Sequence, residues 1–146
     1  MNLHAALAYL DQHTNLEATA GRAEGLSLDR MAKLVHALGD PQGAYRVIHI
    51  TGTNGKGSVA RMCTALLEAA GLSVGTYTSP HLESLNERIS WNGEPIDDDA
   101  LAASIASVAA VEPLVGITPS YFEIMTAAAF TYFADAALRD PRGIAS

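Results

Sequence analysis

Cysteine is nearly absent from this chain, since Cys63 is the single cysteine among 146 residues. One cysteine cannot form a disulfide within the chain, which excludes a small secreted scaffold held together by disulfides and fits a reducing compartment. Cys63 lies within a helical pattern, so we interpret it as a buried small apolar residue rather than a reactive thiol.

Long uninterrupted apolar runs are also missing. The nearest approach to a membrane span, residues 101–117, contains a glutamate and a proline, whereas a spanning helix needs about 20 mostly apolar residues. Residues 1–22 lack a basic start followed by an unbroken apolar stretch, so we expect no signal peptide. These two absences predict a cytoplasmic protein without a membrane partner.

Positive charge is scarce, because 9 lysines and arginines stand against 16 aspartates and glutamates and leave a formal net charge of −7. A net negative chain repels nucleic acid and anionic membranes, so we expect neither as a general partner. An anionic small molecule would need a local site that overcomes this background. Hydrophobic residues make up 49% of the chain, which is enough for the core of one ordinary domain.

The pattern of apolar residues predicts a mixed α/β chain. Steps of three and four residues are typical of helices, and short β-branched runs indicate strands. The predicted helices cover residues 3–10, 28–38, 58–70, about 98–110 and 121–138, and the predicted strands cover residues 46–50 and 73–78. We expect the first strand to be buried. The helix between the two strands predicts that they run parallel, with a right-handed crossover.

Turn and capping residues mark the ends of several predicted elements. Gly39 and Gly71 are placed to end helices, and Ser27 is placed to cap the second helix. Asn92 and Gly93 together predict the turn of a hairpin.

Two features bear on the rest of the fold. The acidic run Asp97–Asp99 opens the fourth predicted helix, where negative charge suits the positive end of the helix dipole, and we favour this reading over a metal site. Beyond residue 137 we find no further strand. Two strands alone make a marginal sheet, so the α/β pattern looks interrupted.

A glycine-rich loop joins the first predicted strand to the next helix. It reads Gly52-Thr53-Asn54-Gly55-Lys56-Gly57-Ser58. Glycine reaches positive φ without penalty and leaves room for another group. The inward N–H groups of such a loop, together with the partial positive charge of a helix N-terminus, form a cradle for an anion. Lys56 adds a full positive charge for a phosphate, and Ser58 adds a hydroxyl.

The loop departs twice from the strict phosphate-binding pattern G-x-x-x-x-G-K-[S/T]. Ile50 stands where the first glycine should be, and Gly57 stands where the hydroxyl residue should be. The loop is therefore a shorter variant. A glycine turn with an exposed lysine is the structural alternative, and we favour phosphate binding because the loop lies between a strand and a helix.

Four ordered segments carry a resemblance to a known family. They are GLSLDRMAKLVHALGDPQ at 25–42, HITGTNGKGSV at 49–59, TSPHLESLNERISWNGEPI at 78–96 and YFEIMTAAAF at 121–130. Together they resemble the folylpolyglutamate synthase and dihydrofolate synthase family, which belongs with the Mur ligases. The resemblance implies an α/β fold, namely a P-loop-type three-layer domain with parallel strands. Residues 1–146 would be an incomplete N-terminal ATP-binding domain, and the C-terminal ligase domain would be absent.

The resemblance also implies a reaction in folate biosynthesis. Such ligases use ATP to turn a carboxylate into an acyl phosphate, which the amine of L-glutamate then attacks to form an amide. The carboxylate belongs to dihydropteroate or to a folate. Charge that develops on a transferring phosphoryl group needs fixed donors, a cation and a metal.

Individual residues receive roles from the same resemblance. Lys56 and the loop backbone from Gly52 to Ser58 would hold the ATP phosphates, with Lys56 acting in catalysis. Ser79 and Glu123 match positions that help bind Mg²⁺, an ion that prefers oxygen ligands and keeps several waters. Ser79 would then supply the hydroxyl that Gly57 lacks.

Each of these assignments has a simpler structural alternative. Ser79 would otherwise be a turn cap before a proline, and Glu123 an acid in the first turn of a helix. We favour a loop role over a ligand role for His81, and packing in the strand for His49. The segment Glu24, Gly25, Leu26 resembles, weakly, part of the family's pterin-side loop.

Members of the family are much longer, and several of their later motifs are missing here. A histidine ligand of Mg²⁺ and a modified lysine are among them, so we expect this chain alone to be an inactive fragment. The alternatives are a nucleotide-binding module that no longer catalyses and a truncated remnant that does not fold stably. A small kinase is a further alternative, in which residues 78–96 would have no evident role.

Overall fold

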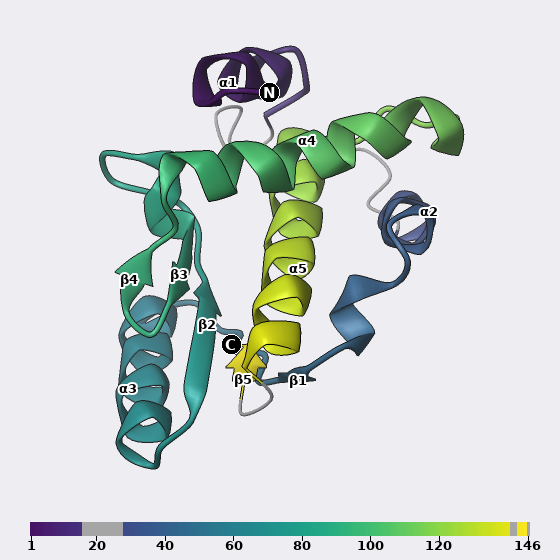
Figure 1. Cartoon of the computed structure of the whole chain (residues 1–146). Helices are drawn as coiled ribbons and strands as arrows, with labels where there is room; N and C mark the ends of the chain where they lie inside the picture. Colours follow the sequence, from purple (N-terminus) through teal and green to yellow (C-terminus); the bar gives the residue numbers. More distant parts are fainter. Residues whose placement is uncertain (16–27, 141–142, 146) are drawn as a thin grey trace. The chain divides into compact units, whose positions relative to one another are not determined.

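The computed structural model describes residues 1–15, 28–140 and 143–145 (Figure 1). The chain divides into two compact units, a helical unit of Met1–Gln42 with Asp98–Tyr132 and a sheet unit of Gly43–Asp97 with Phe133–Ser146. The chain is therefore a mixed helix and sheet protein. Glu24, Gly25, Leu26 and Ser27, which carry two of the predictions, lie outside the described residues.

The described residues of the helical unit form four helices. They are α1 (Leu3–Asp11), α2 (Asp29–Ala37), α4 (Asp98–Val115) and the first part of α5 (Tyr121–Arg139). Helix α4 packs against both α1 and α2. The buried side chains of this unit include Leu10, Leu34, Leu101, Ile105 and Ile124. These apolar contacts form its core and confirm the helices that the apolar spacing predicts.

Helix α4 runs past its predicted end at residue 110 and includes Pro113. The predicted end of this helix is therefore wrong for the last turn of α4. The carboxylate of Glu112 in this turn is hydrogen-bonded to Tyr9 and His13, which holds the turn against α1.

No helix in the described ranges is long and apolar enough to cross a bilayer.

The described residues of the sheet unit form five strands in the order β1-β5-β2-β3-β4 (Figure 1). They are β1 (Arg46–Val47), β2 (Ser73–Tyr77), β3 (Ile89–Trp91), β4 (Glu94–Pro95) and β5 (Gly143–Ala145). Strand β5 pairs in parallel with both β1 and β2, with Ile144 opposite Arg46 on one side and Val74 on the other. Strand β3 pairs antiparallel with β2 on one side and with β4 on the other. The 3-10 turns η1 (Pro41–Gly43) and η2 (Leu85–Arg88) precede β1 and β3.

Strand β5 corrects the expectation that no strand follows residue 137. It is only three residues long, too short for an alternating pattern to reveal it. Because β5 lies between β1 and β2, the two predicted strands are parallel to each other but are not neighbours.

Strand β1 corrects the expectation of a buried strand over residues 46–50. Only Arg46 and Val47 are in the strand, and Val47 is 53% exposed. Among the described strands β1 lies at the edge of the sheet and pairs with β5 alone, so its outer side lacks a covering strand. His49, predicted to be packed in this strand, is exposed and follows it.

Helix α3 (Lys56–Ala69) packs on β2 through small residues. Thr64 of α3 and Thr76 of β2 are buried and share a hydrogen bond of 2.8 Å between their hydroxyls. Cys63 is only half-buried, so its expected burial is partial. The predicted hairpin turn is confirmed, since Asn92 and Gly93 have φ values of 51° and 80° between β3 and β4.

Gly75 of β2 is a glycine because an aromatic ring packs closely against it. A Cβ on Gly75 of β2 would lie 2.5 Å from ring atoms of Phe133, which packs across the strand. Phe133 also contacts the rings of Tyr45 and Trp91 within the same unit. This aromatic cluster anchors the sheet from which the candidate site projects.

Candidate functional site

The glycine-rich loop connects β1 to α3, as the sequence predicts. Gly52 and Gly55 have φ values of 146° and 77°, a region that favours glycine, and α3 begins directly afterwards at Lys56. The N-cap position is Gly55, which has no side chain to satisfy the first N–H groups of the helix. Residues 51–59 are exposed. An open N-terminus of a 14-residue helix with its positive dipole end is a ready site for an anion.

Lys56 lies over this loop. Its Nζ donates to the backbone oxygen of Gly52 at 2.7 Å, in an exposed position. A neutral carbonyl is a weaker acceptor for an ammonium group than a phosphate oxygen. The amine is thus held beside the open N–H groups by a contact that an anion can replace.

Gly57 has no structural need to be glycine. Its φ lies outside the left-handed region, and beyond its chain neighbours and the nearby backbone of its own helix a Cβ there would meet no described atom within 4 Å. Glycine inside a helix costs about 1 kcal/mol relative to alanine. Gly57, Ser58 and the loop residues Thr53 and Asn54 are all exposed.

A second segment, residues 78–81, leaves the end of β2. Ser79 is exposed and is joined to Pro80 by a cis peptide bond. Because β1 and β2 are parallel, this segment and the glycine-rich loop both project from the edge where these strands end. Open α/β sheets bind ligands outside the carboxyl ends of their parallel strands. The sheet thus brings Ser79, His81 and the glycine-rich loop to one edge.

Hydrogen bonds from Glu87 order the chain after this segment. Its carboxylate accepts from the backbone N–H groups of Leu82, Glu83 and Ser84 at 3.0, 2.8 and 2.8 Å. These bonds stabilise the charged form and lower the pKa of Glu87 below its usual range. The nearby Arg88 is buried, and its Nε donates to Nδ1 of His81 at 2.9 Å.

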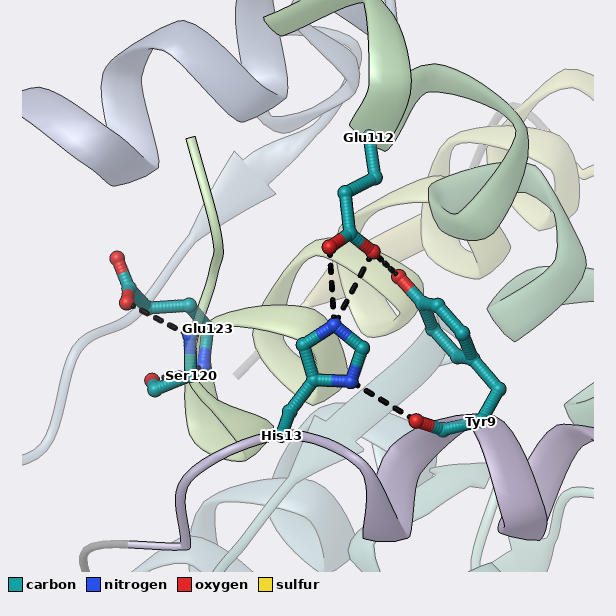
Figure 2. Close-up of polar contacts among 5 residues, drawn as sticks. All are labelled: Tyr9, His13, Glu112, Ser120 and Glu123. Atoms are coloured by element: carbon teal, nitrogen blue, oxygen red, sulfur yellow. Dashed lines mark hydrogen bonds and ion pairs between the residues drawn. The ribbon is translucent and has the colours of Figure 1, made fainter. Parts of the chain in front are cut away.

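Glu123 lies in the helical unit, in the first turn of α5 (Figure 2). Its Oε1 accepts from the Ser120 N–H at 3.0 Å, and its own N–H donates to the Ser120 hydroxyl at 3.2 Å. Arg30 forms an ion pair with the same oxygen at 3.2 Å. The two bonds with Ser120 form a capping box, which is the structural alternative for Glu123. Ser79, the other residue predicted to bind Mg²⁺, belongs to the sheet unit.

In the described parts of the chain, no group of three or more His, Cys, Asp or Glu side chains could hold a metal ion. Asp98 and Asp99 occupy the first turn of α4. That position agrees with the helix-dipole reading of the acidic run.

A polar cluster of Tyr9, His13 and Glu112 was not predicted (Figure 2). The Tyr9 hydroxyl donates to Glu112, and His13 Nε2 lies 3.0 Å from Glu112 Oε1. Burial, reinforced by Glu112, raises the pKa of Tyr9. Tyr9 lies in the last turn of α1 and His13 follows the C-cap of that helix, but no local signal points to Glu112, which lies 99 residues beyond His13. The cluster ties α1 to α4.

Known proteins resemble this chain in sequence. No family model matches it. A folylpolyglutamate synthase of Lacticaseibacillus casei is 43% identical over 138 residues, which cover 91% of this chain and 31% of that protein. A dihydrofolate synthase/folylpolyglutamate synthase of Bacillus subtilis is 45% identical over 112 residues, or 74% of this chain and 26% of that protein.

Solved structures agree with the sequence matches. The Mycobacterium tuberculosis folylpolyglutamate synthase complexed with ADP has a TM-score of 0.82 and 38% identity, over 98% of this chain and 31% of that one. A folylpolyglutamate synthase complex with AMPPCP and folate has a TM-score of 0.83 and 38% identity, over 100% of this chain and 35% of that one. By sequence and by structure, this chain belongs to the folylpolyglutamate synthase and dihydrofolate synthase family, and it spans 31% or less of the two curated relatives described above.

Proposed function

We propose that this chain is the nucleotide-binding part of an ATP-dependent ligase that adds L-glutamate to dihydropteroate or to a folate. The observation that carries this proposal is the open N-terminus of α3 with Lys56 beside it. Relatives solved with ADP and with AMPPCP support a nucleotide ligand. The names of the relatives support the acceptor, because they include dihydrofolate synthases and folylpolyglutamate synthases.

The loop residues act on the phosphates in this proposal. Backbone N–H groups from Gly52 to Ser58 donate to phosphate oxygens, and Lys56 leaves the Gly52 carbonyl to neutralise charge on the transferring group. The carboxylate of the acceptor attacks the γ-phosphorus of ATP, and ADP leaves. The amine of glutamate then attacks the carbonyl carbon of the acyl phosphate, and inorganic phosphate leaves as the amide forms. Because these N–H donors are already in place before the reaction, they stabilise the charge that develops in the transition state without having to move.

Mg²⁺ fits the donors that the chain offers, since a hydroxyl and a carboxylate are hard oxygen ligands. We keep Ser79 and Glu123 as proposed ligands, Ser79 because its side chain is exposed after β2 and Glu123 on the family resemblance. The bond from the Ser120 N–H and the ion pair with Arg30 both engage Oε1 of Glu123, which is compatible with the other oxygen binding an ion. When bound, the ion neutralises charge on the phosphates.

The architecture belongs to the same proposal. We place residues 1–146 in a P-loop-type three-layer ATP-binding domain of a cytoplasmic enzyme, with the C-terminal ligase domain outside this chain. The chain matches 31% of the Lacticaseibacillus casei relative, so we expect no glutamate-dependent ADP release from these residues alone. ADP release above that of a Lys56→Ala control would contradict this expectation, whereas nucleotide binding without turnover agrees with it.

Calorimetric titration with Mg-ATP tests the nucleotide site. We expect Lys56→Ala to abolish measurable binding, because the full positive charge at the loop is lost, while the fold is unchanged. Lys33→Ala is the matched control, since Lys33 is an exposed lysine on α2 in the helical unit. Equal affinity of the Lys56→Ala variant and the unaltered chain would show that the loop is not the phosphate site.

A further inference from the structure

Arg88 is an unusual interior residue, because its side chain is only 2% exposed. Burying a guanidinium group is costly unless its N–H groups are hydrogen-bonded. Its Nε donates to Nδ1 of His81 at 2.9 Å, and its backbone oxygen accepts from the Thr78 N–H at 2.9 Å. Arg88 therefore fixes both ends of the segment 78–81 that leaves β2.

The chemistry of arginine assigns the proton on His81. Arginine has only donors, so Nδ1 of His81 must accept and carries no proton. In the neutral ring the proton then lies on Nε2. In the part of the chain that the structure describes, the hydrogen bond to Arg88 is the only one made by the His81 ring. Its Nε2–H is therefore an oriented donor.

The parallel strands place this donor and the proposed phosphate site at the same end of the sheet. His81 follows β2 and the glycine-rich loop follows β1, and these two parallel strands are separated by β5 alone. Two strand spacings amount to about 10 Å. A nucleoside triphosphate, or a nucleoside triphosphate together with the carboxylate that it phosphorylates, is long enough to reach from the end of β1 to the end of β2.

We propose that His81 is a further ligand-binding residue whose Nε2–H donates to an anionic oxygen at this edge, and that Arg88 is its positioning residue. The anionic oxygen belongs to the ATP phosphates or to the carboxylate of the acceptor. This inference rests on the proposed function, because it needs an anionic ligand at the ends of β1 and β2. The backbone N–H groups of residues 82–84 donate to the Glu87 carboxylate and hold the chain that follows in place.

The tautomer is tested first, without ligand. Long-range proton–nitrogen correlation spectra of the ¹⁵N-labelled chain, with His81 assigned by its loss in His81→Gln, should show a proton on Nε2 and none on Nδ1. Arg88→Lys should leave a mixture of tautomers, because lysine cannot reach Nδ1 in the same plane. A proton on Nδ1 in the unaltered chain overturns the proposal.

Ligand binding is tested with His81→Phe and His81→Gln. We expect His81→Phe to weaken binding about tenfold, since a hydrogen bond to a charged group is lost, and His81→Gln, which keeps an N–H donor, to recover part of it. Titration with Mg-ATP alone and with pteroate in the presence of Mg-ATP separates the two sources. A loss in the first titration indicates a phosphate oxygen, and a loss only in the second indicates the acceptor carboxylate.

Controls separate this inference from the proposed function. His36→Phe alters an exposed histidine on α2 and should bind both ligands as the unaltered chain does. If Lys56→Ala abolishes binding while folded His81→Phe binds both ligands normally, the role of His81 is refuted and the nucleotide site stands. If the unaltered chain binds neither ligand, the nucleotide site itself fails, and the role of His81 fails with it.

Discussion

Single residues in the glycine-rich loop show what the sequence can and cannot reveal. The motif predicts the positions of Gly52, Gly55 and Lys56, because the need for positive φ and for charge is local. The contact from Lys56 to the Gly52 carbonyl and the burial of Arg88 depend on atoms brought together by folding, so no pattern in the sequence predicts them. The same holds for Glu112, whose partners lie near the opposite end of the chain.

Gly57 provides a prediction at the scale of one residue. Gly57→Ala should stabilise the chain by up to about 1 kcal/mol, because alanine favours the helix and its Cβ meets no described atom beyond its chain neighbours and the nearby backbone of its own helix. It should also weaken Mg-ATP binding at least tenfold, since the methyl group occupies the space beside the open N–H groups. Urea unfolding and calorimetry measure the two effects. A stabilised variant with full affinity would place the ligand elsewhere.

Glu87 gives the chain a local dependence on pH. Folding lowers the pKa of Glu87 below its ordinary value of 4.5. The stability that Glu87 contributes is therefore fully present above pH 4.5 and is lost as the pH falls through the lower pKa of the folded state. Glu87→Gln should therefore flatten the loss of stability on the acid side of pH 4.5. The urea midpoint measured across this range tests the effect. Glu83→Gln, which alters the exposed neighbouring carboxylate, should follow the unaltered chain.

At the scale of elements, periodicity predicts the helices well and their buried faces poorly. The pattern of α3 places Val59, Met62 and Leu66 on an apolar face, yet these side chains are 44%, 60% and 71% exposed. Ala60 and Thr64 are the residues buried on that helix, because α3 packs on β2 through small side chains. The pattern identifies a helix, but the choice of face depends on the packing partner.

The start of α5 provides a prediction at this scale. Ser120→Ala should lower the free energy of unfolding by about 1 kcal/mol, since it removes the side-chain cap that accepts from the Glu123 N–H. Ser107→Ala is a matched control in the middle of α4, where the hydroxyl only bonds back to the Ala103 carbonyl. Denaturant unfolding of both variants measures the difference. Equal stability of the two variants would show that the capping box contributes little.

At the scale of the whole molecule, the family was recognisable from four ordered motifs, and the comparisons confirm it. The sheet was only partly predictable, because β5 has three residues and its place between β1 and β2 is set by long-range pairing. The division into a helical unit and a sheet unit was not predicted, since the residues of each unit come from two separate stretches of the chain.

Thermal unfolding with and without Mg-ATP tests the central claim, that these residues fold and bind a nucleotide phosphate at the glycine-rich loop. A ligand that binds only the folded state at a hundredfold excess over its Kd stabilises that state by about 2.7 kcal/mol. We predict one or more cooperative transitions, of which the sheet unit's rises with Mg-ATP in the unaltered chain and not in Lys56→Ala. A transition that ignores Mg-ATP in both chains would contradict the account.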